Sequence, residues 1–317
     1  MADAEVGGRG RPLRAARAAA RILLLALGAA PALAAGEDRL DVLATTTVLA
    51  SLLEAVGGAR VSASALVPPD LNAEDYQPHP QDLARLKTAR LVVRVGLDYD
   101  LWLDRLLAQA QNPALGRGGP GYVDASFGIA VLDVRGAAVG PTGGHAHGSG
   151  NPHYWLDPAN AEIITATILE ALARLDPPAA KRYESQRLRF VDDLRSKLAV
   201  WERTLAPLQG RPMVAYHNTW AYFARHFRLN FAGFIEERAG VPPSPAHLAG
   251  LLRAMREQPI TVIVREPHEP ERNTTFLADK TGARVVVLAS AVGAVPAARD
   301  YISLFDYNAS ALAAAFR

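Results

Sequence analysis

The 317-residue sequence contains no cysteine, which excludes disulfide bonds, thiolate metal ligands, cysteine nucleophiles and a lipid-modified N-terminal cysteine. It also lacks a strong net charge, because 34 basic and 32 acidic side chains leave only +2, too little to suggest a nucleic-acid partner. No run reaches the roughly 18 consecutive apolar residues of a membrane-spanning helix. Hydrophobic residues still make up 50% of the chain, so it can bury a core, and its length predicts two domains.

Residues 1–35 are typical of a secretory signal peptide. Five arginines precede a short apolar run, and small residues follow up to Ala34 and Ala35, where we expect cleavage. The segment holds five arginines against Asp3 and Glu5, a net of 5 − 2 = +3, so the remainder carries 2 − 3 = −1. With no cysteine to carry a lipid, we expect export to the periplasm as an unlipidated protein.

The remainder of the chain alternates short apolar runs with helical patterns in two separate regions. Runs at 40–46 and 91–96 alternate with helical stretches in the first region, and a run at 212–216 begins the same pattern in the second. Strands and helices that alternate in this way favour a parallel or mixed sheet covered by helices. We therefore expect an N-terminal α/β lobe over 36–178 and a C-terminal α/β lobe over 208–317.

One long helix, predicted over 179–207, separates the two halves. Its apolar residues recur mostly at steps of three or four and form one stripe, while charges fill the other faces. The stripe consists of Tyr183, Phe190, Leu194, Leu198, Trp201 and Leu205. Such a helix is about 40 Å long, enough to contact both lobes as a rigid connector. The expected fold is therefore two α/β lobes joined by a rigid linking helix, with small lobe movements.

Several of the eight histidines follow predicted strands. His217 comes directly after one strand, His268 follows another by three residues, and His153 lies in a loop bracketed by prolines. Ligands of α/β proteins bind at the carboxyl ends of strands, so these three histidines are candidate metal ligands. His226 and His247 fall within predicted helices, where we expect structural roles.

A glycine-rich segment at 143–150 carries His145 and His147. Short histidine-rich tracts can bind metal, and a disordered connector would explain the same composition equally well. Both interpretations stay open. If the segment does bind metal, we expect it to assist capture without forming the main site, because ordering a glycine-rich loop costs entropy.

Several segments together resemble the periplasmic metal-binding receptors of ABC importers, the ZnuA/TroA-like family. The resemblance covers essentially the whole chain after the N-terminal segment. The segments are 75–78 with 82–83, 153–158 (HYWLDP), 216–223 (YHNTWAYF), 262–266 and 281–283. The resemblance implies two α/β lobes, a rigid linking helix and a divalent metal ion between the lobes, delivered to a membrane permease.

The chain departs from this family at two of the four expected ligand positions. Glu74 stands where the family usually has histidine, and Ala289 stands where a carboxylate usually follows the last strand. His268 offers a compensating imidazole, and His79 is an alternate donor in the first lobe. The expected ligands are Glu74 and His153 from the first lobe and His217 and His268 from the second.

Three imidazoles and one carboxylate suit Zn(II), the expected transported ligand. A Mn(II) or Fe(II) receptor, or an adhesion protein on the same fold, is the alternative within this fold. A different class is a zinc-dependent hydrolase with His145 and His147 as ligands and Glu266 as general base. Neither HExxH nor GxSxG occurs, which favours a protein that is not an enzyme. We expect a monomeric receptor whose partners are the metal ion and an ABC importer permease.

Overall fold

The computed structural model describes residues 39–133, 149–238 and 240–317. These residues form two four-stranded sheets in which every neighbouring pair of strands is parallel. The first sheet has the order β2-β1-β3-β4 and the second β6-β5-β7-β8. The strands are β1 Leu40–Ala44, β2 Val61–Ala65, β3 Leu91–Arg94, β4 Tyr122–Asp124, β5 Pro212–Ala215, β6 Asn230–Phe234, β7 Val262–Arg265 and β8 Arg284–Val287. The predicted α/β fold class is confirmed.

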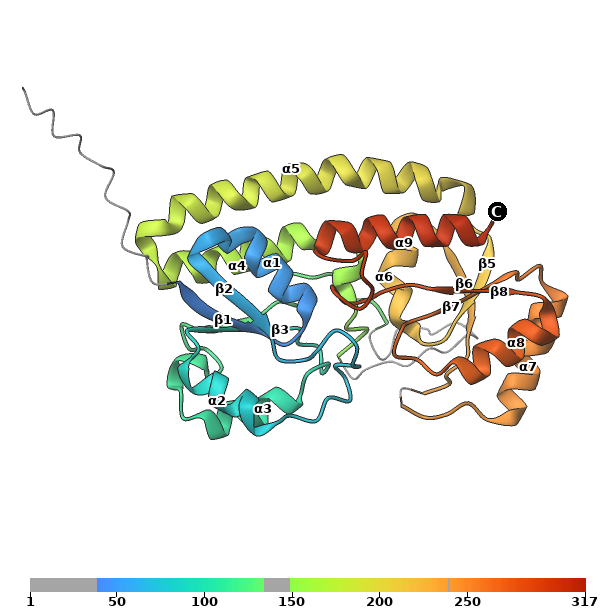
Figure 1. Ribbon diagram of the computed structural model, residues 1–317, viewed down its shortest axis with the longest axis horizontal. Helices are drawn as coiled ribbons and strands as arrows, with labels where there is room; N and C mark the ends of the chain where they lie inside the picture. The colour runs from blue at the N-terminus through green and yellow to red at the C-terminus, as the bar shows by residue number, and fades with distance from the viewer. Residues whose placement is uncertain (1–38, 134–148, 239) are drawn as a thin grey trace, which may run out of the picture. The chain divides into compact units, whose positions relative to one another are not determined.

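Helices accompany both sheets (Figure 1). The first lobe contains α1 Thr47–Gly57, α2 Pro80–Thr88, α3 Trp102–Ala110 and α4 Asn160–Leu175. The second contains α6 Ala221–Phe227, α7 Pro245–Glu257, α8 Glu271–Thr281 and α9 Tyr301–Ala315. Buried strands are apolar along most of their length: all four residues of β3 are buried, and three of four in β5 and in β7. This is the pattern of parallel sheets covered on both faces, and it leaves the strand ends as the places for polar side chains.

Helix α5, Ala180–Leu205, is the predicted linking helix, and it extends alongside both lobes (Figure 1). It packs against α1 and α4 of the first lobe and against α9 of the second. Four side chains of the predicted stripe are buried: Tyr183, Leu194, Trp201 and Leu205. The other two, Phe190 and Leu198, are half-buried against the core. The ring of Trp201 stacks on that of Phe305 at 5.1 Å, so the stripe is also the seam with α9.

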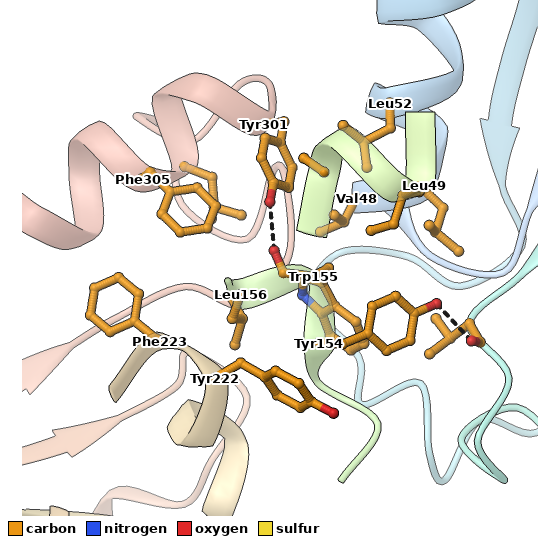
Figure 2. Close-up of a cluster of buried hydrophobic side chains, with 14 of the residues drawn as sticks. Val48, Leu49, Leu52, Tyr154, Trp155, Leu156, Tyr222, Phe223, Tyr301 and Phe305 are labelled. Carbon is orange, nitrogen blue, oxygen red and sulfur yellow. Dashed lines mark hydrogen bonds between the residues drawn. The ribbon is translucent and has the colours of Figure 1, made fainter. Parts of the chain in front are cut away.

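One of the hydrophobic clusters of the core continues from one lobe into the other. Figure 2 shows part of it, where Trp155 lies among side chains from both lobes. The hydroxyl of Tyr301 donates to the carbonyl of Trp155 at 2.7 Å, and the Trp155 indole N–H donates to the carbonyl of Ser290 at 2.9 Å. The backbone N–H of Tyr301 also donates to the hydroxyl of Ser51 at 3.1 Å. These hydrogen bonds connect the two lobes, which supports the expectation of small lobe movements.

Phe305→Ala is expected to lower the free energy of unfolding by about 3–5 kcal/mol, because it empties a fully buried site. The ring packs against Trp201, Phe223 and Tyr301. Chemical denaturation measures the loss. Phe276→Ala is the control, since that ring is 41% exposed on α8 and its loss should cost about 0.5 kcal/mol or less. Equal losses in the two variants would contradict the shared core.

Candidate metal centre

Three side chains distant in sequence bring their ligand atoms together between the lobes. Glu74 lies in the loop between β2 and α2, His153 precedes the short turn Tyr154–Leu156, and His217 follows β5. The Oε1 atom of Glu74 lies 3.3 Å from Nε2 of His153 and 4.0 Å from Nε2 of His217. All three ligand atoms lie within 4.8 Å of one another. A tetrahedral zinc ion needs donor atoms roughly 3.4 Å apart, so this spacing suits one ion.

The two imidazoles are held through their other ring nitrogens. Nδ1 of His153 lies 3.1 Å from Oδ1 of Asn151, and Nδ1 of His217 lies 2.7 Å from Oε2 of Glu236. Both oxygens accept hydrogen bonds, so each contact is satisfied by a protonated Nδ1 in a neutral ring. Nε2 then carries the lone pair, and it is the nitrogen that faces Glu74 in both rings. This arrangement is how metal-binding histidines are oriented in proteins.

The surroundings of His217 favour a positive charge. Burial alone would lower the pKa of this imidazole, but the hydrogen bond to Glu236 and the negative charges of Glu74, Glu236 and Glu266 outweigh it. Together they raise the pKa of His217 above its usual value of 6.5. The same negative charges would stabilise a metal cation bound at Nε2.

The three donors line a cavity of about 330 Å³. Five carboxylates line it, and the described lining residues include no lysine or arginine. The carboxylates are Glu74, Asp75, Glu236, Glu266 and Glu269. A cleft lined by one sign of charge concentrates counter-ions, so this cavity attracts cations.

His268 lines the same cavity but is not grouped with the first three donors. It is exposed on the loop between β7 and α8, and its ligand atom lies within 4.8 Å of those of Glu266 and Glu269. The structure therefore brings three of the four predicted ligands into one group and places His268 in a second. Its role as the fourth ligand of the inner ion stays a prediction.

The remaining sequence candidates lie elsewhere. His79 is exposed at the start of α2, where its backbone N–H donates to the carboxylate of Asp82 at 2.8 Å, and it is not among the lining residues. Ala289 is fully buried after β8 and offers no ligand atom. His145 and His147 lie outside the described residues.

The two histidines predicted to be structural are on helices, as expected. His226 on α6 contacts the carboxylate of Asp157 at 2.7 Å. His247 on α7 contacts the carbonyl of Phe234 at 2.8 Å. Neither lines the cavity.

Sequence reasoning missed two carboxylates of this cavity. Glu236 lies two residues after β6, and Glu269 lies in the same loop as His268. The signal that could have found them was available, because both lie beyond the carboxyl end of a predicted strand in the second lobe. The rule that ligands lie at the carboxyl ends of strands applies to carboxylates as well as to histidines.

Comparison with known proteins places the chain among metal receptors. A family profile described as "ZnuA: Zinc-uptake complex component A periplasmic" matches residues 42–315. The iron-binding protein YfeA of Yersinia pestis is 25% identical over 294 residues, covering 88% of this chain and 86% of that protein. The high-affinity zinc uptake system protein ZnuA of Yersinia pestis is 26% identical over 232 residues, covering 69% and 73%. A crystal structure of ZnuA matches with a TM-score of 0.74 at 27% identity, covering 87% of this chain and 99% of that one.

Proposed function

The chain belongs to the family of periplasmic zinc-uptake components, the metal-binding receptors of ABC importers, and we propose that its cargo is Zn(II). We propose that Glu74, His153 and His217 hold the ion. The observation that carries the proposal is the convergence of three ligand atoms within 4.8 Å, in a cavity rich in carboxylates.

The origin of the ligands gives the mechanism. Glu74 and His153 belong to the first lobe and His217 to the second, so a bound ion links the lobes. Because one core already joins them, capture requires adjustment of side chains and loops rather than a wide closure. The loaded receptor then delivers the ion to the membrane permease of an ABC importer, and no chemical step is needed.

Zn(II) is the cargo that fits the inner donors best. Two imidazole nitrogens and one carboxylate oxygen, spaced for tetrahedral coordination, are typical zinc ligands. The second candidate is Mn(II) or Fe(II), which prefer more oxygen ligands. The five carboxylates of the cavity favour that alternative, and one relative is named an iron-binding protein.

Competition among metals tests the proposal. The purified protein is stripped with a chelator and titrated with Zn(II), Mn(II) and anaerobic Fe(II) against a chromophoric chelator. We expect one tight zinc ion per chain and affinities for manganese and iron at least about tenfold weaker. Tighter binding of Mn(II) or Fe(II) would transfer the proposal to the second candidate, and no tight binding of any of the three would refute a receptor role.

We also propose that residues 1–35, outside the described residues, are removed on export near Ala34 or Ala35, and that the product is an unlipidated monomer. In the described ranges, no helix combines the length and the apolar character needed to cross a membrane. Intact mass and N-terminal sequencing of protein recovered from the periplasm should give a chain that begins near residue 35 or 36. Recovery of an intact Met1 would contradict this.

Glu236→Gln is expected to weaken zinc binding about tenfold or more, because the amide can still accept from Nδ1 of His217 but lacks the charge. Protons compete with zinc for His217, so affinity should fall with pH as the imidazole is protonated. Glu236 raises the pKa of His217, so the variant should show this fall at lower pH than the native protein.

Titrations from about pH 5 to pH 8 measure both effects. The matched control is Glu237→Gln, since that neighbouring carboxylate contacts His247 at 3.6 Å and does not line the cavity. Identical pH profiles for the two variants would mean that Glu236 does not act through His217.

A further inference from the structure

The loop between β7 and α8 carries a second group of ligand atoms. Glu266, His268 and Glu269 each offer one ligand atom, and these atoms lie within 4.8 Å of one another. All three side chains line the cavity that contains the first group. The group combines one imidazole and two carboxylates, a donor set that first-row divalent metals accept.

The two carboxylates of this group are nearly inaccessible to solvent. Glu266 is 3% exposed and Glu269 is 7% exposed. The hydroxyl of Thr219 donates to Oε1 of Glu266 at 2.6 Å, and the hydroxyl of Ser290 donates to its Oε2. Both oxygens of Glu266 are thus held in a fixed orientation in the cavity wall.

Unlike Glu266, Glu269 accepts a hydrogen bond at only one of its two carboxylate oxygens among the described residues. The backbone N–H of Glu266 donates to its Oε2 at 2.6 Å, and no described residue donates to its Oε1. Buried carboxylates are costly unless they are paired with a positive charge. Glu269 is therefore a buried, incompletely paired carboxylate that faces the cavity beside an imidazole.

The positive charge of Arg265 favours the ionised form of Glu269, but it acts from outside the cavity lining. Arg265 is not among the lining residues, and its guanidinium donates to the backbone carbonyls of Glu266 and Glu269 at 3.0 and 3.2 Å. It also pairs with the carboxylate of Glu271. The described cavity lining contains no lysine or arginine that could neutralise this pair.

We propose that Glu266, His268 and Glu269 form a second, outer position for a divalent transition-metal ion. This inference rests on the proposed function and deepens it. Of the six donors in the two groups, only His268 is exposed, so an ion arriving from solvent can contact this imidazole first. Two dications in one cavity repel each other, so the outer position binds more weakly once the inner position is filled. It therefore loads the inner site rather than storing a second cargo ion.

Zinc stoichiometry tests the outer position. The metal-stripped protein is titrated with Zn(II) by calorimetry, and bound zinc is counted after equilibrium dialysis. The native chain should bind one tight ion and a second ion at least about a hundredfold weaker. His268→Gln with Glu269→Gln should remove the weaker ion and change the tight affinity by less than about threefold. His268→Gln alone, at an exposed residue, gives the same test if the double variant folds poorly.

The matched control is His79→Gln with Glu257→Gln, which makes the same chemical changes at exposed residues outside the cavity. It should keep both ions. A native protein that binds only the tight ion would overturn the proposal, and so would loss of the tight ion on changing His268, which would make His268 an inner ligand.

A further variant separates this proposal from the proposed function. His153→Ala with His217→Ala should lose the tight ion and keep the weak one. If the native chain binds only the weak ion, and the loss of both inner histidines changes nothing, the receptor proposal fails while the outer position stands. If the native chain binds only the tight ion, the outer position fails while the receptor stands.

Discussion

Alanine in place of His153 or of His217 is expected to weaken zinc binding about a hundredfold or more. Each ring directs Nε2 towards the carboxylate of Glu74, at 3.3 and 4.0 Å, and each is buried or nearly so. A four-ligand zinc site is worth about 10–16 kcal/mol, or roughly 3 kcal/mol per ligand, which corresponds to about two orders of magnitude in affinity. Competition titration against a calibrated chelator measures the loss.

Glu74→Ala should show a comparable loss, because Glu74 is the carboxylate that the described residues group with both imidazoles. Glu74→Gln keeps the shape of the side chain and removes its charge. Comparing its zinc affinity with that of Glu74→Ala therefore separates the contribution of the charge from that of packing. His79→Ala is the control, since its side chain is exposed and outside the cavity lining. If His79→Ala weakened zinc binding as much as His153→Ala, the first-lobe ligands would be wrongly assigned.

The fold was predictable because its signals are local. The stripe on α5 repeats at helical spacing over about six turns, and each strand of the second lobe is a short apolar run. Strand β4, Tyr122–Asp124, and helix α4, Asn160–Leu175, were not predicted. A three-residue strand is too short to show a period of two, and its place in the sheet is set by pairing with β3.

The site was predictable only in part, for a reason that His268 illustrates. Sequence places a residue after a strand, but it does not say how the following loop turns. His217 follows β5 and is aimed inward because Glu236, from the end of β6, holds its Nδ1. His268 is carried by a longer loop onto the exposed part of the cavity wall, beside Glu269. Such contacts between loops of different strands cannot be read from spacing.

Ala289 stands where the family usually has a carboxylate, and the structure compensates for it in a different way from the one that the sequence suggests. Ala289 leaves no ligand after β8, and the sequence offered His268 as compensation. In the structure, the hydroxyl of Ser290 instead bonds the carboxylate of Glu266, a buried side chain at the end of β7. A carboxylate is therefore retained near this edge of the sheet, supplied by the neighbouring strand.

Removal of the metal is expected to lower the stability of the protein by a large and calculable amount. An ion that binds only the folded chain stabilises it by RT ln(1 + [M]/Kd), about 4 kcal/mol at a free concentration a thousand times Kd. For a chain of this size, that corresponds to a fall in Tm of about 10 °C on chelation. Differential scanning calorimetry with buffered free zinc measures the shift.

The same experiment distinguishes two ways in which zinc could stabilise the protein. The lobes already share a core and the hydrogen bonds of Trp155 and Tyr301, so the ion should add its binding energy without compacting the molecule. We expect the Tm shift to depend on His217, and to fall to about a third or less in His217→Ala at the same free zinc concentration. Small-angle scattering should give the same radius of gyration with and without zinc. A large compaction on binding would mean that the metal, rather than the shared core, holds the lobes together.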